Sequence, residues 1–203
     1  MKTLNLNIKD QNIFFTSDLH LQHEKIIKYC NRPFNSVKEM NQTIINNWNN
    51  IVGEKDIIFI LGDFCFRSSR TTWVYFLSKL NGIKYLIKGN HDRYKDIPFD
   101  KFEQVTELLN INIKKDLEIP EGQRITLCHY PMLSWYQSHR GSWQLFGHIH
   151  TVPNNTGLET SYVQNRISSN QYDVGVDQNN FTPLSYQAVK SIITKQNLYN
   201  KNK

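Results

Sequence analysis

Short apolar runs recur along the chain, and most of them stop at a cluster of Asp, His, Asn or Gly residues. The runs occupy residues 13–16, 57–61, 85–87, 125–128 and 143–146. Runs of this kind, rich in aromatic and β-branched residues and bounded by turn residues, are typical of buried strands. In layered α/β folds, ligands bind just beyond the carboxyl ends of the strands. The repeated polar clusters therefore predict one shared site at the strand ends.

Amphipathic segments between these strands predict helices. Ser36 and Glu39 have the spacing of a capping box, which favours the start of a helix at this point. An apolar face then continues at helical spacing through residues 37–48. A second helix is predicted over residues 73–80, before Gly82, because glycine readily ends a helix. The aromatic residues of both segments are expected to belong to the core.

The chain of 203 residues is expected to form a single domain over residues 1–198, since no linker or internal repeat interrupts it. Apolar positions after Pro183 predict a last helix over residues 184–193, and residues 199–203 are expected to form a frayed polar tail. Residues 152–170 are rich in Asn, Ser and Thr. They predict a surface excursion whose role the sequence does not indicate.

Composition narrows the class of protein. The net charge is +6, from 24 Lys and Arg against 18 Asp and Glu, but the basic residues are scattered. A nucleic-acid partner is therefore left open and not favoured. Three cysteines without a C-x-x-C pair indicate neither a disulfide framework nor a thiolate zinc site. No stretch approaches the ~20 apolar residues of a membrane span, so we expect a cytoplasmic protein without a membrane partner.

Histidines concentrate at the predicted strand ends. Six of the seven lie in the polar clusters, whereas scattered core histidines would not follow the strands. They are His20, His23, His91, His129, His148 and His150. Imidazole and carboxylate ligands without thiolate suit first-row cations such as Mn, Fe or Zn. The clusters therefore predict a metal site.

The individual motifs differ in how much they indicate. Asp18 and His20 form a D-x-H pair, which an extended chain points to one side, although such pairs are common by chance. The pair Gly62-Asp63 is also an ordinary turn signal. The G-N-H-D motif of residues 89–92 is more specific. Its glycine lets the backbone approach a site, and three polar side chains follow a buried strand.

The G-H-x-H motif of residues 147–150 indicates two cations. On an extended segment, the backbones of His148 and His150 lie roughly 6.5–7 Å apart. This separation suits two cations about 3.5–4 Å apart. Either histidine can serve either ion. Asp63 is expected to bridge the two ions, because a carboxylate has two oxygens.

Taken in order, D-x-H, G-D, G-N-H-D, the histidine at position 129 and G-H-x-H resemble the five motifs of the calcineurin-like metallophosphoesterase superfamily. Residues 31–34, 128–131 and 173–177 more narrowly resemble a group of small bacterial and phage-type predicted phosphoesterases. The resemblance runs from Phe14 to about Val189, nearly the whole chain. Five motifs in one order are far more specific than any one of them.

The resemblance implies an α/β fold, namely a four-layer α/β/β/α sandwich of two mixed β-sheets flanked by helices, with the site at one edge of the sheets. It also implies two divalent metal ions. Mn is expected to support activity best in vitro, with Fe, Zn or Ni as alternatives. The first ion would be held by Asp18, His20, Asp63 and His150. The second would be held by Asp63, Asn90, His129 and His148.

Beyond the ligands, the resemblance implies a catalytic role for His91, and Asp92 is a further catalytic candidate. His91 is not expected to be a ligand. It would face the scissile phosphate and donate a proton to the leaving oxygen, for which an ordinary pKa near 6.5 is suitable. Asp92 would orient His91 or a backbone amide. A metal-bound hydroxide then attacks phosphorus in line, since bound cations lower the pKa of water toward roughly 7.

Three residues are candidates for contacting the substrate. His23 is expected either to touch the leaving group or to open the following helix as a surface residue. Arg32 and Arg93 belong, with Arg67 and Arg140, to a set of arginines that can form bidentate contacts with phosphate. The alternative for each arginine is a surface ion pair.

These features predict a metal-dependent phosphoesterase, expected to be a phosphodiesterase that acts on a small phosphate ester or nucleotide. One alternative is a nuclease on DNA or RNA, but neither a capping domain nor a basic path beside the site is evident in the sequence. The other alternative is a non-catalytic interaction protein on the same fold. The presence of every ligand position and of His91 argues against it.

Overall fold

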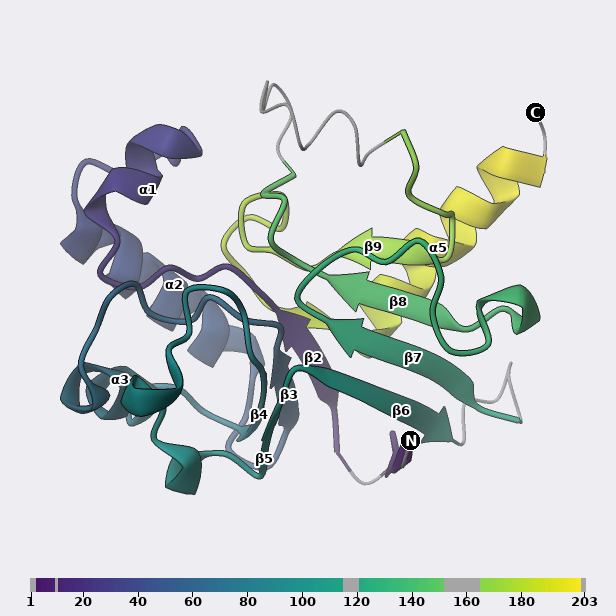
Figure 1. Cartoon of the computed structure of the whole chain (residues 1–203), viewed down its shortest axis with the longest axis horizontal. Helices are drawn as coiled ribbons and strands as arrows, with labels where there is room; N and C mark the ends of the chain where they lie inside the picture. The colour runs from purple at the N-terminus through teal and green to yellow at the C-terminus, as the bar shows by residue number, and fades with distance from the viewer. Residues whose placement is uncertain (1–2, 10, 115–120, 152–164, 202–203) are drawn as a thin grey trace.

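Two five-stranded sheets form the centre of the molecule (Figure 1). The computed structural model describes residues 3–9, 11–114, 121–151 and 165–201. The first sheet has the order β10-β2-β3-β4-β5, from Leu184–Ser185, Ile13–Thr16, Ile57–Ile60, Ile83–Ile87 and Gln104–Thr106. The second has the order β1-β6-β7-β8-β9, from Thr3–Asn7, Leu108–Lys114, Gln123–Cys128, Trp143–Phe146 and Gln171–Asp173.

The first sheet is parallel from β2 to β5, and β10 pairs with β2 in the antiparallel direction. Every residue of β2 and β3 is buried. Parallel strands covered on both faces are continuously hydrophobic, which is why the short apolar runs predict them. Because β2, β3 and β4 are parallel neighbours, their carboxyl ends lie side by side at one edge.

The second sheet is mixed. Strand β6 runs antiparallel to β7, whereas β7, β8 and β9 are parallel to one another and β1 is parallel to β6. The arrowheads of β7, β8 and β9 all point toward the middle of the molecule in Figure 1. The residues after β7 and β8 are thereby brought toward the first sheet.

Apolar side chains from both sheets form one core between them. Phe15 of β2 and Phe59 of β3 stack there, with ring centroids 5.7 Å apart. Successive strand residues point to opposite faces, so Phe14 and Ile58 belong to a second core on the other side of the first sheet.

Three helices cover that second core, namely Glu24–Tyr29 (α1), Val37–Ile51 (α2) and Arg70–Leu77 (α3) (Figure 1). The start of α2 has the predicted cap, because Ser36 Oγ accepts a hydrogen bond from the backbone N–H of Glu39 at 3.2 Å. The Glu39 carboxylate in turn accepts from the backbone N–H of Asn35 at 2.8 Å. The helix then buries Met40, Ile44 and Trp48.

The last helix, Tyr186–Lys201 (α5), packs Tyr186, Val189 and Ile193 into the core between the sheets. It continues past residue 198, so part of the stretch expected to be a frayed tail is helical. Short helical turns also occur at Tyr94–Asp96, Phe99–Lys101 and Ser138–Arg140. The predicted single-domain α/β architecture, with two mixed sheets flanked by helices, is confirmed.

Five strands, β1, β5, β6, β9 and β10, lie outside the apolar runs that predict strands. Strand β6 alternates, because Leu109 and Ile111 face the core while Asn110 and Asn112 occupy the intervening positions. Of the excursion expected over residues 152–170, residues 152–164 lie outside the described part of the chain.

Candidate metal centre

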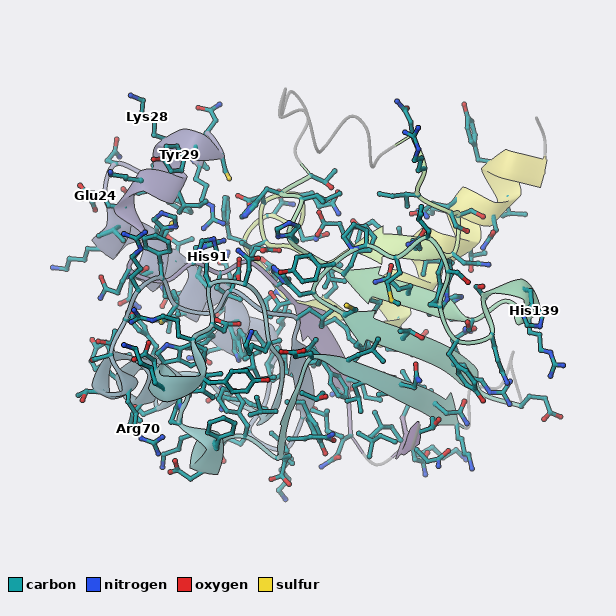
Figure 2. All side chains as sticks on the ribbon, viewed as in Figure 1. Glu24, Lys28, Tyr29, Arg70, His91 and His139 are labelled. Carbon is teal, nitrogen blue, oxygen red and sulfur yellow. The ribbon has the colours of Figure 1, made fainter. Side chains whose placement is uncertain are left out.

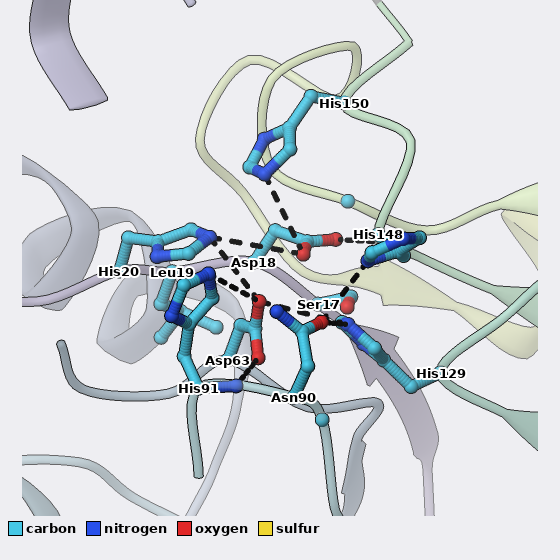
Figure 3. Close-up of polar contacts among 12 residues, drawn as sticks. Ser17, Asp18, Leu19, His20, Asp63, Asn90, His91, His129, His148 and His150 are labelled. Atoms are coloured by element: carbon cyan, nitrogen blue, oxygen red, sulfur yellow. Dashed lines mark hydrogen bonds and ion pairs between the residues drawn. The ribbon is translucent and has the colours of Figure 1, made fainter. Parts of the chain in front are cut away.

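The structure brings all seven predicted ligands together at one edge of the two sheets (Figure 3). Each of five strands ends just before one of them. The seven are Asp18 and His20 after β2, Asp63 after β3, Asn90 after β4, His129 after β7, and His148 and His150 after β8. The parallel strands of both sheets thus deliver their carboxyl ends to one place, as the polar clusters predict.

Five of these seven residues have a left-handed backbone. They are Asp18, His20, Asp63, His148 and His150, with φ between 45° and 72°. Residues other than glycine rarely adopt this conformation. It costs of order 1–3 kcal/mol per residue and concentrates at functional sites. The fold therefore holds these side chains in place against local preference.

Two glycines permit the backbone to approach the centre. A Cβ atom on Gly89 would lie 2.3 Å from Asp63 Oδ1. A Cβ atom on Gly147 would lie 2.0 Å from Ser17 Oγ and 2.3 Å from Asp18 Oδ2. Any side chain at either position would displace a carboxylate of the centre. This explains why both motifs, G-N-H-D and G-H-x-H, begin with glycine.

The Asp63 carboxylate lies between two imidazoles. Its Oδ2 atom is 3.5 Å from His20 Nε2 and 3.6 Å from His129 Nε2. Its other oxygen, Oδ1, accepts a hydrogen bond of 2.9 Å from the backbone N–H of His91. One oxygen is thus anchored to the backbone, and the other faces both halves of the centre.

Asp18 divides its oxygens in the same way. Oδ2 accepts from the backbone N–H of His148 at 2.9 Å, while Oδ1 lies 4.0 Å from His20 Nε2 and 3.8 Å from His150 Nε2. Within the described residues, the buried atoms Asp18 Oδ1 and His20 Nε2 have no hydrogen-bond partner. A buried polar atom without a partner is costly. A cation bound to both atoms removes that cost.

The other half of the centre contains a close pair of acceptor atoms. The Nδ1–H of His129 donates to the carbonyl of Leu61 at 2.7 Å, so the lone pair of the neutral imidazole is on Nε2. That atom lies 2.9 Å from Asn90 Oδ1, which is itself 3.0 Å from His148 Nδ1. Two acceptors about 3 Å apart fit a shared cation, because metal–ligand bonds of this kind are about 2.0–2.2 Å long.

The predicted ligands form two overlapping groups, and Cys30, His150 and Asp177 form a third group among the described residues. Asp18, His20 and His150 place one ligand atom each within 4.8 Å of one another, and so do Asp18, Asp63 and His129. Nitrogen and carboxylate donors of this kind suit divalent first-row cations. The residues present therefore fit divalent metal ions.

The pKa values of three candidate ligands, Asp63, His20 and His150, are shifted in the protein. Burial raises the pKa of Asp63 to about 7, although the neighbouring His129 opposes this shift. Burial and the nearby His150 lower the pKa of His20 well below its usual value. For His150, burial lowers the pKa, but Asp18 and a hydrogen bond to Asp177 outweigh it and raise the pKa well above the usual value. A bound cation favours the ionised carboxylate of Asp63, since its positive charge offsets the solvation that the carboxylate loses on burial.

The prediction that Arg32 contacts the substrate is corrected, because Arg32 is buried. Its side chain forms an ion pair with Asp177, with Nε 2.7 Å from Oδ1. Asp177 Oδ2 in turn accepts from His150 Nδ1 at 2.7 Å. Asp177 was not among the candidate site residues. It lies in the motif of residues 173–177, but only the fold brings it to His150.

Asp92 and His91 occupy different environments. The Asp92 carboxylate is buried and accepts backbone N–H bonds from Asp63, Phe64 and Gly89 at 2.8–3.0 Å. Of the two roles expected for it, the contact with backbone amides is therefore the one present. His91 is partly exposed, and its Nε2 lies 3.9 Å from Asp63 Oδ2.

The two remaining candidates differ as well. His23 is the N-cap residue of α1, but it is buried and not on the surface. Its Nδ1 lies 3.3 Å from His20 Nδ1, and burial, followed by the charge of His91, lowers its pKa to about 4. Arg93 forms an ion pair with Asp96, with Nε 2.6 Å from Oδ2, and is half exposed. The surface ion pair was the alternative expected for Arg93.

An α/β sandwich with a cluster of histidine, aspartate and asparagine donors at its strand ends is the framework of a metal-dependent hydrolase. The chain belongs to the calcineurin-like phosphoesterase family, whose model matches residues 11–152. It is therefore a metal-dependent phosphoesterase, and the predicted family is confirmed. Across the described residues, no helix is long and apolar enough to cross a membrane.

The chain is similar to proteins from archaea and phages. It is 34% identical to an uncharacterised protein of Methanocaldococcus jannaschii, over 91% of this chain and 93% of that one. It is 26% identical to the gene 66 protein of Mycobacterium phage L5, over 82% of this chain and 86% of that one. The crystal structure of a protein of unknown function from Aquifex aeolicus shares the fold, with a TM-score of 0.64 and 23% identity, over 90% of this chain and 99% of that one.

Proposed function

We propose that this protein is a dinuclear phosphodiesterase that hydrolyses small nucleotide-type substrates, with His91 as the general acid. The observation that carries the proposal is the position of Asp63 Oδ2, 3.5 Å from His20 Nε2 and 3.6 Å from His129 Nε2. A carboxylate oxygen between two imidazoles that belong to different groups of donors is suited to bridge two cations.

The ligands divide between two ions in this proposal. Asp18, His20, Asp63 and His150 hold the first, and Asp63, Asn90, His129 and His148 hold the second. The unpartnered atoms of Asp18 and His20 support the first group, and the facing acceptors of His129 and Asn90 support the second. Two cations held there supply the chemistry, because they neutralise phosphoryl oxygens and activate a water for in-line attack near neutral pH.

His91 is the group that supplies a proton to the leaving oxygen. Its imidazole is 39% exposed, so a substrate can reach it, and its backbone N–H is fixed by Asp63. Burial, followed by the charges of His129 and His150, lowers the pKa of His91. A bound phosphate anion beside the ring opposes this shift and favours the protonated form. Asp92 acts indirectly. Its carboxylate accepts from the backbone N–H groups of Asp63 and Gly89, and so holds the two loops that carry Asp63 and His91.

The state of the arginines favours a diester over a monoester. A monoester dianion is normally bound by arginine side chains in addition to the metal ions. Arg32 is engaged with Asp177, and Arg93 is engaged with Asp96. Arg67 is the one arginine among the described residues that line the pocket beside His91. A diester carries one charge fewer and has a second substituent, which the open side of the centre next to His91 can receive.

An activity panel tests the proposal. Metal-free protein is supplemented with Mn²⁺, Fe²⁺, Ni²⁺ or Zn²⁺ and assayed on nitrophenyl diesters and monoesters, cyclic nucleotides, dinucleotides and single-stranded nucleic acid. We expect about two ions per chain by elemental analysis, loss of activity with chelator, and the highest rates with Mn²⁺ on small diesters. A monoester preference of tenfold or more in kcat/KM, about 1.4 kcal/mol of transition-state discrimination, would overturn the diester assignment. Trace metal only would overturn the dinuclear site.

A further inference from the structure

A pocket of about 540 Å³ opens beside His91. Its floor is formed by three imidazoles of the centre, and its walls come from α1 and from the turn that follows β3. The lining residues used below are His20, His91, His150, Tyr29, Phe66 and Arg67. Figure 2 shows Tyr29 on α1 and His91 on the same side of the molecule. Pockets of about 300–1,000 Å³ are the usual size for small-molecule sites, so a nucleoside fits here.

Three aromatic side chains, those of His23, Tyr29 and Phe66, line the walls of the pocket beside the charged residues Glu24 and Lys25. The rings of His23 and Phe66 stack with centroids 3.5 Å apart and an interplanar angle of 5°. Tyr29 meets His23 edge-on, with centroids 6.3 Å apart, and 67% of Tyr29 is exposed. A large aromatic side chain exposed at the mouth of a pocket has no role in the core. It is available to stack on a ligand.

The backbone holds these walls in place. The N–H of Phe66 donates to the carbonyl of Leu21 at 3.0 Å, which ties the turn after β3 to the segment that leads into α1. The N–H of His23 donates to the carbonyl of His20 at 3.0 Å. Both walls are therefore anchored to residues next to the metal centre, and little ordering is needed before a ligand binds.

A positively charged side chain, that of Arg67, lies at the edge of the pocket. The guanidinium of Arg67 is 5.2 Å from the centroid of the Phe66 ring. Arg67 is exposed, and over the described ranges no carboxylate lies within ion-pair distance of it. A guanidinium beside an aromatic ring offers stacking and hydrogen bonding to a nucleobase or contact with a phosphate.

We infer that this pocket receives the leaving-side group of a phosphodiester and selects a leaving group that carries a flat aromatic base. The inference rests on the proposed function, because it takes His91 as the proton donor. His91 lines the pocket, so a group that fills the pocket is attached to the oxygen that His91 protonates. Tyr29 stacks on the base, and Arg67 contacts its edge. A sugar or alkyl leaving group gains no such stacking.

Matched substrates test the inference. A dinucleotide is compared with the analogue that lacks the base on the leaving side, since both release the same kind of ribose alkoxide. Stacking on an aromatic side chain is expected to give the dinucleotide an advantage of about tenfold or more in kcat/KM. Tyr29→Ala should remove most of that advantage and leave the rate on the abasic analogue within about twofold. Tyr29→Phe should retain the advantage.

The control variant is Tyr75→Ala, because Tyr75 is also an exposed tyrosine, on α3, and does not line the pocket. It should leave both rates unchanged. Equal rates on the two substrates in the wild-type protein, or an equal loss on both in Tyr29→Ala, would overturn the inference while the phosphodiesterase activity stands.

A binding measurement keeps the inference testable if no diester is hydrolysed. Calorimetric titration of the Mn²⁺-loaded protein compares adenosine monophosphate with ribose 5-phosphate, which share the phosphate and the sugar. The base-bearing ligand should bind about tenfold tighter or more, and Tyr29→Ala should abolish the difference. Identical affinities would overturn the inference. Absence of hydrolysis with the affinity difference intact would overturn the proposed function and the leaving-side assignment, and would leave only the recognition of a base by the pocket.

Discussion

Arg32 and Asp177 form a bidentate ion pair, with Nε 2.7 Å from Oδ1 and Nη2 2.9 Å from Oδ2. Both side chains are at most 1% exposed. The same guanidinium donates to the backbone carbonyls of Asp18 and Leu19 at 2.8 and 3.0 Å. Asp177 also accepts from His150 Nδ1. The buried guanidinium of Arg32 therefore positions two candidate ligands of the first metal ion, Asp18 through its backbone carbonyl and His150 through Asp177.

The first prediction concerns this arrangement. Asp177→Asn should lower the affinity for the first cation about 10- to 100-fold, the usual effect of removing a group that orients a ligating histidine. Metal titration by calorimetry measures the affinity, and thermal melting of the metal-free protein measures stability separately. Asp96→Asn, which removes the partner of the half-exposed Arg93, is the control and should leave metal affinity unchanged. Reduced stability with unaltered metal affinity in Asp177→Asn would make Asp177 a structural residue only.

The second prediction compares Asp63 with His20. Asp63→Asn should lose more metal and more activity than His20→Ala, because a bridging carboxylate serves both ions and a terminal histidine serves one. Elemental analysis after incubation with Mn²⁺, followed by removal of free metal, gives the number of ions retained. We expect fewer than one ion in the first variant and about one in the second. Equal retention of metal and activity would count against the bridge.

The third prediction concerns His91. His91→Ala should keep both cations yet lose rate, and the loss should depend on the leaving group. A nitrophenolate leaves without much help, whereas a ribose alkoxide needs a proton, and general acid catalysis is worth about 10²- to 10⁴-fold. The comparison of kcat for a nitrophenyl diester and a dinucleotide measures the difference. A uniform loss on both substrates, or loss of a metal ion, would assign His91 another role.

The sequence predicts those parts of the site that depend on local order. Residues 13–16 and 143–146 are strands with the expected bounds. Asp18 follows the first strand and His148 follows the second, and both lie in the candidate metal centre. Parallel strands carry their ends to a common edge, so a run followed by Asp or His places a ligand without knowledge of the pairing. The alternation of apolar residues and Asn in β6 was an available signal for a further strand, since successive strand side chains point to opposite faces.

Long-range contacts are what local patterns do not predict. Arg32 and Asp177 are 145 positions apart, and nothing in the spacing of either residue indicates a partner. The sequence therefore predicts either a phosphate contact or a surface ion pair for Arg32, and neither is the buried pair that the fold forms. The left-handed backbone of Asp18 and His20 was also unforeseeable, because local preference disfavours it and tertiary contacts impose it.

The fourth prediction concerns pH. In the metal-free protein, burial raises the pKa of Asp63 from 3.8 to about 7. Between these two values, the folded chain binds more protons at this carboxyl group than the unfolded chain does. The contribution of Asp63 to stability is therefore present at low pH and is lost as pH rises through about 7. A cation requires the ionised carboxylate, so below about 7 it must displace a proton.

Metal binding should for this reason strengthen as pH rises from 6 to 8, by up to about 1.4 kcal/mol per pH unit for each proton released. The raised pKa of His150 acts in the same direction, since this imidazole also must lose its proton to bind a cation. The increase in Tm on adding Mn²⁺ should thus be larger at pH 8 than at pH 6. A shift in Tm that is constant or falls with pH would show that neither proton is linked to metal binding.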